Sequence, residues 1–286
     1  MKKNRLLSFL IILAIYLLAS IVGIICYNIL ELAFWLKILI ADISATIIVF
    51  IFSVLLKNAS VYDPYWSVAP IVILIALACE YSINLTGWLS VIAVVVWGIR
   101  LTLNWAYTFK NLTCEDWRYR MLNEKTGKFY PIINFVGIHL VPTLVVYCCI
   151  MPLAYLIQTG VEFNVFTIIC FICCLFSVFL QGISDITMHK FRKNKNGVFN
   201  RNGVWKYSRH PNYLAEILMW YSAGMMAVLT FMGNLYLLSG AILNTLLFIF
   251  VSIPLADNHQ RLRKDGFDLY KSETRKLLPI KKPLFS

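Results

Sequence analysis

The sequence predicts an all-α membrane protein, a polytopic helical bundle of about eight transmembrane helices with both termini in the cytoplasm. The first observation behind this class is composition: 60% of the 286 residues are hydrophobic and only 14% are charged. Soluble domains are closer to half apolar and a quarter charged, so most side chains here are suited to a bilayer. The other two observations are the lengths of the apolar segments and the positions of the basic residues between them.

The chain contains eight apolar segments long enough to cross a bilayer, which takes about 20 apolar residues in a helix. The first follows Lys2, Lys3 and Arg5, as the apolar part of a signal peptide would. It is too long for that role and no small-residue cleavage site follows it, so we expect a retained helix. The predicted spans are residues 6–27, 32–56, 67–85, 87–108, 131–157, 164–188, 213–231 and 235–255.

The basic residues orient these spans. The net charge is +12, and 24 of the 26 Lys and Arg residues fall at the termini and in the loops of one side. Only Lys37 and Arg100 lie elsewhere, both inside spans. Because cytoplasmic loops carry the excess of Lys and Arg, we expect both termini in the cytoplasm. We attribute the charge to topology and membrane lipid, and expect no nucleic acid as a partner.

The eight cysteines lie mostly in or beside apolar runs. Cys170 and Cys173 have the spacing of a metal-binding pair, but no histidine or second pair accompanies them at zinc-site distances. We therefore expect apolar packing of these thiols, no disulfide framework and no metal site.

The predicted cytoplasmic loops contain three segments with structure of their own, residues 57–66, 111–131 and the basic loop 189–212. An Asp-Pro step in residues 57–66 disfavours helix just before the third span. Aromatic residues among charges in residues 111–131 indicate an interfacial helix. Because neither a repeat nor a low-complexity linker divides the chain, we expect a single membrane domain, residues 1–286, that begins with N-terminal helices in residues 1–60.

A cluster of polar residues stands at the start of the seventh span. Arg209 and His210 end the preceding loop, and Asn212 stands where the helix would begin, a position at which Asn often serves only as a cap. Asn212, Glu216 and Trp220 are four residues apart and therefore share one helix face. A carboxylate in the first turns of a membrane span is costly, which indicates a functional role.

The loop before this helix is strongly basic. Asp185 lies near the end of the sixth span and is followed by Arg192 and further Lys and Arg residues. Such a loop can wrap an anionic ligand, since Arg grips phosphate bidentately and Lys supplies point charge. The alternative is that these charges only face the cytoplasm and anionic lipid.

Residues 185–216, with the pattern D-x6-R-x16-R-H-P-N-Y-x-x-E, and the tail 257–279 resemble the steroid 5-alpha-reductase family. The similarity is greatest to its bacterial-type branch, grouped as DUF1295, and extends to sterol C14-type reductases. The segments DPYW at 63–66 and WGIRLTLNW at 97–105 are similar to segments of the same branch. The resemblance covers most of residues 61–280 and implies a cofactor site within residues 185–280.

This resemblance implies an enzyme, an NADPH-dependent oxidoreductase acting on CH–CH groups and similar to a 3-oxo-5-alpha-steroid 4-dehydrogenase. The expected reaction reduces a carbon–carbon double bond conjugated to a carbonyl in a lipophilic, steroid- or isoprenoid-like substrate. The resemblance places Asn212 and Glu216 beside the nicotinamide, and Tyr207, Arg209 and His210 on ribose and phosphates. It completes the cofactor site with Asp185, Arg192, Asp257, His259 and Arg263.

Hydride addition to an enone also needs an acid that polarises the carbonyl. The resemblance implies a carboxyl and a tyrosine on the N-terminal helices, for which Asp63 and Tyr65 are the matches, with Glu216 as a further catalytic candidate. Trp97 stands where the family has a second tyrosine. An aromatic interface belt is the alternative reading of Tyr65. Structural roles are favoured for the intramembrane residues Asp42, Glu80 and His139.

Two other functions stay open at this point. Isoprenylcysteine carboxyl methyltransferases share the RHP-x-Y logic but use S-adenosylmethionine, and they continue with Gly and paired Glu where this chain has Ala215 and Asp257-Asn258-His259. A transporter or lipid-binding protein is the third class, although the chain shows no paired half-repeats with broken helices. The sequence does not assign an oligomeric state.

Overall fold

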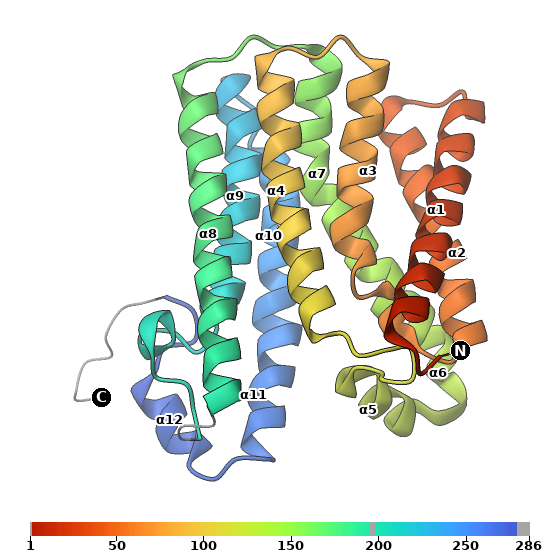
Figure 1. Cartoon of the computed structure of the whole chain (residues 1–286). Coiled ribbons are helices and arrows are strands. Elements are labelled where there is room, and N and C mark those ends of the chain that lie inside the picture. Colours follow the sequence, from red (N-terminus) through yellow and green to blue (C-terminus); the bar gives the residue numbers. More distant parts are fainter. Residues whose placement is uncertain (1, 195–197, 279–286) are drawn as a thin grey trace. The chain divides into compact units, whose positions relative to one another are not determined.

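The computed structural model describes residues 2–194 and 198–278, and the elements in these residues are helices and turns (Figure 1). Within these described residues, eight helical segments are long and apolar enough to cross a membrane. The predicted fold class is therefore confirmed: the chain is an integral, multi-pass membrane protein of the all-α class. The cytoplasmic location of the termini stays a prediction.

The chain divides into two compact units, Met1–Gly160 and Val161–Ser286. Each is described here by itself. The expectation of one membrane domain rested on the lack of a linker in the sequence, and this boundary lies at the short turn between two predicted spans.

The first unit contains four long helices followed by a helical segment with several local geometries. Its elements are α1 (Arg5–Ile29), α2 (Phe34–Leu56), η1 (Ala59–Tyr62), α3 (Tyr65–Glu80), α4 (Leu85–Thr108), α5 (Trp117–Thr126), η2 (Gly127–Phe129), α6 (Tyr130–Ile133), the π-helical η3 (Asn134–Leu140) and α7 (Val141–Thr159).

Local sequence sets where these helices begin and how closely they pack. The Asn84 side chain accepts from the Gly87 amide and so caps α4, which begins at Leu85, while α3 ends at Glu80, five residues before the predicted end of the third span. The α3–α4 approach requires Gly98, because a Cβ there would lie 2.4 Å from the Ser67 carbonyl oxygen. The expected helix in residues 111–131 is present as α5, capped by Asp116.

The second unit is built on the long helix α8, which packs against α9 along much of its length. Its elements are α8 (Val165–Asn194), η4 (Gly203–Lys206), α9 (Pro211–Thr230), η5 (Leu235–Leu238), α10 (Ser239–Leu247), the π-helical η6 (Phe248–Ser252), α11 (Ile253–Arg261) and α12 (Phe267–Glu273). Helix α8 continues six residues beyond the predicted end at 188. Residues 195–197 of the basic loop and Pro279 of the tail lie outside the described residues.

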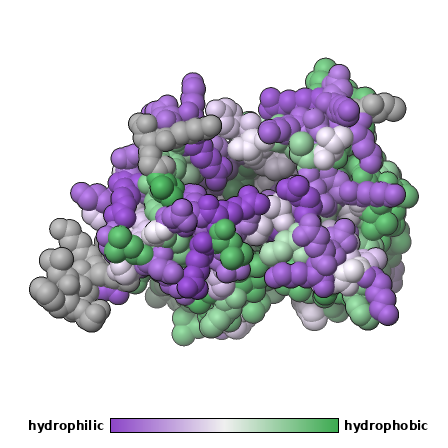
Figure 2. All heavy atoms as spheres, turned by 90° about the horizontal axis from the view of Figure 1, so that it is seen from below, coloured by the Kyte–Doolittle hydropathy of each residue, from purple (hydrophilic) through white to green (hydrophobic). Residues whose placement is uncertain are grey.

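The surface of each unit fits a bilayer. The sides of the helices expose large apolar residues, such as Leu10 and Leu17 on α1 and Phe176 and Phe179 on α8. The helix ends seen in Figure 2 are covered mainly by hydrophilic side chains. An apolar side and a polar end are what lipid chains and the membrane surface require of a spanning helix, so contact with membrane lipid follows.

Candidate functional site

The first unit contains a partly open cavity of about 490 Å³. Its walls are residues 16–28 of α1, 38–45 of α2 and 65–80 of α3. Helix α1 packs along α2 but touches α3 at few points, so the cavity lies between α1 and α3. The volume falls in the range that holds drug-sized ligands.

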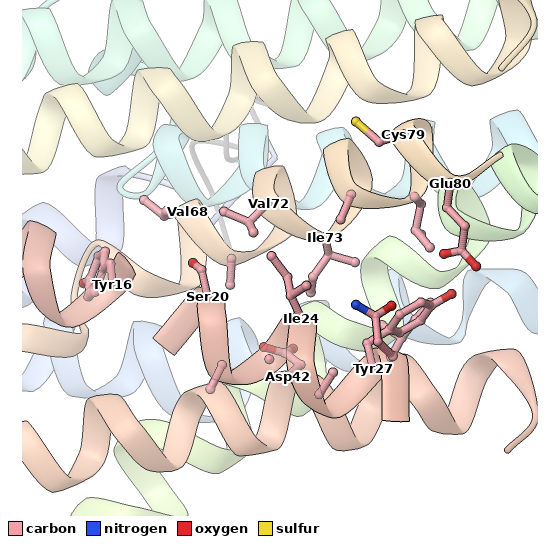
Figure 3. A pocket seen from close by; sticks show the side chains of 18 of the residues that line it. Tyr16, Ser20, Ile24, Tyr27, Asp42, Val68, Val72, Ile73, Cys79 and Glu80 are labelled. Carbon is pink, nitrogen blue, oxygen red and sulfur yellow. The ribbon is translucent and has the colours of Figure 1, made fainter. Parts of the chain in front are cut away.

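Most of the cavity wall is apolar or small. Ile24 of α1 and Val68, Val72 and Ile73 of α3 lie along its length, between Tyr16 at one end and Glu80 at the other (Figure 3). An apolar wall with a few polar groups is typical of a site for a lipophilic small molecule, in which the polar groups fix the orientation of the ligand.

A carboxyl and a phenol meet on this wall. The Tyr65 hydroxyl donates to Oδ1 of Asp42 at 3.3 Å, and both residues are buried. The Tyr65 ring packs edge-on against the Tyr16 ring at 5.6 Å between centroids, and the Tyr16 hydroxyl donates to the Val61 carbonyl at 2.6 Å. Tyr65 is therefore held on two sides, and both Tyr65 and Asp42 line the cavity.

Further hydroxyl groups lie behind this pair. The Thr143 hydroxyl is 2.8 Å from the Tyr62 hydroxyl and 3.0 Å from the Thr46 hydroxyl. Tyr62 also packs against Tyr65 and against the ring of His139, which is fully buried in the π-helical turn η3. Buried polar groups that bond to one another fix a side-chain arrangement, so this network gives the floor of the cavity a defined shape.

The predicted catalytic residue Asp63 is placed differently from Tyr65. Its Oδ1 accepts from the Tyr119 hydroxyl of α5 at 2.6 Å, and Asp63 is not among the residues that line the cavity. Nearby, the Ala59 amide donates to Glu115, where burial raises the pKa of the carboxyl. Asp63 thus joins the turn before α3 to α5, and its hydrogen bond connects two parts of the fold.

In the second unit, Arg209, His210 and Asp257 form one buried cluster. Oδ2 of Asp257 lies 3.1 Å from the Arg209 guanidinium, and Oδ1 lies 2.9 Å from Nε2 of His210. The His210 ring stacks on Tyr213, which stacks in turn on Phe248. The loop before α9 and the helix α11 are therefore joined through one carboxylate.

Arg209 also binds the tail. Its guanidinium donates to the carbonyls of Lys271 and Thr274, and its backbone amide donates to the Arg275 carbonyl at 2.9 Å. With Arg209 only 5% exposed, its terminal nitrogens are directed at protein acceptors. In this structure Arg209 anchors the tail.

Glu216 is buried on the α8–α9 interface. One carboxylate oxygen accepts from the Trp220 indole at 2.8 Å, and the other accepts from the side-chain amide of Gln181. Gln181 is only 2% exposed, and its Oε1 has no hydrogen-bond partner among the described residues. Asn212 is partly buried one turn before Glu216.

The remaining residues of the predicted cofactor site lie nearer the surface. Arg192, Tyr207 and Arg263 are exposed, whereas Asp185 and His259 are partly buried. Burial, together with the nearby Arg192 guanidinium, lowers the pKa of Lys264 in the turn after α11. Two cations close together attract an anion such as phosphate.

The structure therefore brings Arg209 and His210 into contact with Asp257, while Asp63 and Tyr65 contact different partners. The sequence favoured a structural role for Asp42, and Gln181 was not among the predicted site residues. A signal existed for both, because each is a polar residue within an apolar span. The contact between Asp42 and Tyr65, which are 23 positions apart, could not be predicted from the local sequence.

Comparison with known proteins gives one family and one relative. The family model described as "Protein of unknown function (DUF1295)" matches residues 49–274. The Schizosaccharomyces pombe protein "Uncharacterized protein C594.04c" is 26% identical over 204 residues, covering 59% of this chain and 58% of the yeast protein. The chain thus spans little more than half the length of that relative. No solved structure gives a significant match.

Proposed function

The chain belongs to the DUF1295 family, and from that premise we propose that it is a membrane reductase that uses NADPH to reduce a carbon–carbon double bond conjugated to a carbonyl. The substrate is lipophilic, of steroid or isoprenoid character. The observation that carries the proposal is the Tyr65–Asp42 pair on the wall of an apolar cavity. A positioned donor in a water-poor site is what a developing carbonyl oxyanion needs.

The proposed step balances as follows. A hydride adds to the β carbon of the enone, and the alkene electron pair moves toward the carbonyl oxygen. The Tyr65 hydroxyl donates a hydrogen bond to that oxygen, and the resulting enolate takes a proton from solvent at the α carbon. NADPH, when bound, supplies the hydride and leaves as NADP⁺.

Asp42 has a positioning role in this scheme. Its contact with Tyr65 directs the phenol toward the cavity. In the structure the Tyr65 hydroxyl donates to Asp42. Because burying an unpaired carboxylate is costly, the proposal has Asp42 protonated when substrate binds, so that its O–H turns to donate to the phenol oxygen and the Tyr65 O–H turns to the substrate carbonyl. Asp42 thus replaces Asp63 as the proposed partner of the tyrosine.

The residues of the second unit fit a dinucleotide. The buried Oε1 of Gln181, beside Glu216, can accept from a carboxamide N–H, and Asn212 lies one turn away. The adjacent cations Arg192 and Lys264 suit phosphate. We assign these groups to NADPH. The Arg209–His210–Asp257 cluster then supports the site by holding the loop and the tail.

The test is a comparison of cofactors on the purified protein. We expect NADPH to raise the melting temperature, with stabilisation of about 2.7 kcal/mol at one hundred times the dissociation constant, and S-adenosylmethionine to leave it unchanged. We also expect NADPH consumption when androst-4-en-3-one is added. Stabilisation by S-adenosylmethionine alone would reject the reductase in favour of a methyltransferase.

A further inference from the structure

Tyr65 stands at one end of a row of buried hydroxyl groups to which the proposed chemistry gives no role. The Thr46 side chain is hydrogen-bonded to Tyr65, and its hydroxyl is 3.0 Å from the Thr143 hydroxyl. The Thr143 hydroxyl is in turn 2.8 Å from the Tyr62 hydroxyl. We call these four groups the hydroxyl chain; it runs from Tyr65 on the cavity wall through α2 and α7 to Tyr62 in η1.

The two threonines use their hydroxyls for this chain alone. A threonine inside a helix can donate to the backbone carbonyl four residues earlier, and Thr159, Thr187 and Thr245 do so in this protein. Within the part of the protein that the structure describes, the hydroxyls of Thr46 and Thr143 bond only to side chains. Their hydrogens are therefore available to the hydroxyl chain.

The number of hydrogens fixes the direction of these bonds. Each hydroxyl carries one hydrogen, and the three contacts within the hydroxyl chain use one hydrogen each. Because Tyr65 donates its hydrogen to Asp42, its contact with Thr46 takes the hydrogen of Thr46. By the same reasoning, Thr143 donates to Thr46, and Tyr62 donates to Thr143.

The hydroxyl chain is closed to other ligands. Thr46 is fully buried, and Thr143 and Tyr62 are at most 3% exposed. The void that Thr143 and Tyr62 line together with Asp42 and Tyr65 has a volume of about 10 Å³, which is at the lower limit for one water molecule. A hydroxyl removed from the hydroxyl chain therefore has no ready replacement.

The common direction of these bonds affects Tyr65. Hydrogen bonds in a row polarise one another, so each hydroxyl that accepts a bond becomes a stronger donor to the next. Tyr65 is the last of the row, and its hydrogen is the one that the hydroxyl chain does not use. That hydrogen is left for an acceptor outside the hydroxyl chain, which is Asp42 in this structure and the carbonyl oxygen in the proposed step.

We propose that Thr46, Thr143 and Tyr62 are positioning residues that direct the Tyr65 hydrogen to the substrate carbonyl and strengthen that hydrogen bond. This inference rests on the proposed function for the role of Tyr65. The three residues act through Tyr65, since none of them belongs to the wall of the cavity. Their loss therefore weakens stabilisation of the oxyanion more than it weakens binding of the substrate.

The direct measurement is the infrared carbonyl band of androst-4-en-3-one, isotope-labelled at the carbonyl and bound to the full-length protein in phosphatidylcholine nanodiscs without cofactor. A weaker hydrogen bond raises the frequency of this band. Thr143→Val interrupts the hydroxyl chain at its centre with a side chain of nearly the same shape. Since each lost bond weakens the next by about 10–30%, the band should rise by on the order of a third of the shift that Tyr65→Phe produces.

Turnover measures the consequence for the reaction. Thr143→Val should lower kcat for NADPH oxidation by about tenfold, less than the roughly 10²- to 10³-fold loss expected when an oxyanion donor is removed outright. KM should stay within about twofold, because an interaction that strengthens in the transition state acts on kcat. Thr143→Ser keeps the hydroxyl and should restore both the carbonyl band and kcat, whereas a packing role of the Thr143 methyl group would make serine the more harmful substitution.

A matched control exists in the second unit. The Thr167 and Thr230 hydroxyls are buried and 2.9 Å apart, so Thr230→Val removes the same kind of bond at a residue outside the cavity wall. It should leave the carbonyl band and kcat unchanged. The melting temperature without ligand reports whether each variant is folded, and Thr46→Val and Tyr62→Phe break the hydroxyl chain at its other members should Thr143→Val unfold.

The possible results have distinct meanings. In an active protein, a carbonyl band or a kcat that Thr143→Val leaves unchanged overturns the proposal, and so does failure of Thr143→Ser to restore them. Failure of the probe to bind overturns the assignment of this cavity and, with it, the role of the hydroxyl chain. A band that responds to both substitutions as expected, in a protein that does not oxidise NADPH, keeps the effect of the hydroxyl chain on Tyr65 and rejects the reductase.

Discussion

The polar residues buried in the two units differ in what satisfies them. In the second unit, Asp257 binds Arg209 and His210, and the guanidinium reaches further protein carbonyls. In the first unit, Tyr65 and Asp42 bond to each other, and both also line a cavity. A polar group whose partners all belong to the chain stabilises the fold, whereas one that faces a cavity is available to a ligand.

The sequence draws attention to the polar motif of the second unit, whereas this difference directs attention to the first unit. The RHPN segment is the most conspicuous polar motif in the chain, and the structure shows its Arg209 and His210 engaged in anchoring the tail. Asp42 is an acidic residue inside an apolar span, and it contacts the proposed catalytic phenol. On the proposed function, the RHPN motif supports the cofactor site without supplying the reacting groups, which come from less conspicuous positions.

The largest effect on stability is expected from Asp257→Ala. The change leaves the buried guanidinium of Arg209 without its carboxylate, which destabilises a protein by about 3–5 kcal/mol. Denaturant unfolding in detergent micelles measures it. The control Asp268→Ala breaks an exposed pair with Arg261 and should change stability by about 1 kcal/mol or less. Equal effects of the two substitutions would contradict the anchoring role of Asp257.

A smaller effect on the fold and a large effect on chemistry are expected from Tyr65→Phe. Loss of one oxyanion donor lowers kcat by about 10²- to 10³-fold, whereas the single 3.3 Å contact to Asp42 adds little to stability. Steady-state NADPH oxidation with androst-4-en-3-one reports the rate, and the melting temperature reports the fold. Unchanged turnover would show that Tyr65 is not a reacting group. The proposed difference between the polar groups of the two units would then be wrong.

The smallest of these effects is expected from Tyr119→Phe, which tests the role of Asp63. The substitution removes the 2.6 Å hydrogen bond to Asp63 and should lower the free energy of unfolding by about 1–3 kcal/mol. Turnover per folded molecule should not change, because Asp63 lies outside the cavity wall. A selective loss of kcat with normal stability would show that Asp63 belongs to the catalytic site, as the sequence resemblance first implied.

The fold was more accessible from the sequence than the site was. Eight spans follow from apolar length alone, and the part of the chain that the structure describes contains eight helical segments that could cross a membrane. The end of α3 differed from the prediction because Asn84, an apparently ordinary polar residue, caps the next helix. Tyr65 was identified through the DPYW segment, but its partner was sought in the neighbouring Asp63 rather than in Asp42 on another helix.

The sequence by itself determined the class of this protein, its spans and the chemical types available to a site, because hydrophobic length and residue type are properties of the chain. Only the tertiary structure decided which polar groups meet: Asp42 with Tyr65, Glu216 with Gln181, and Asp257 with Arg209. The physical reason is that a helix fixes the neighbours three and four residues away, whereas contacts between helices depend on packing that no local pattern encodes.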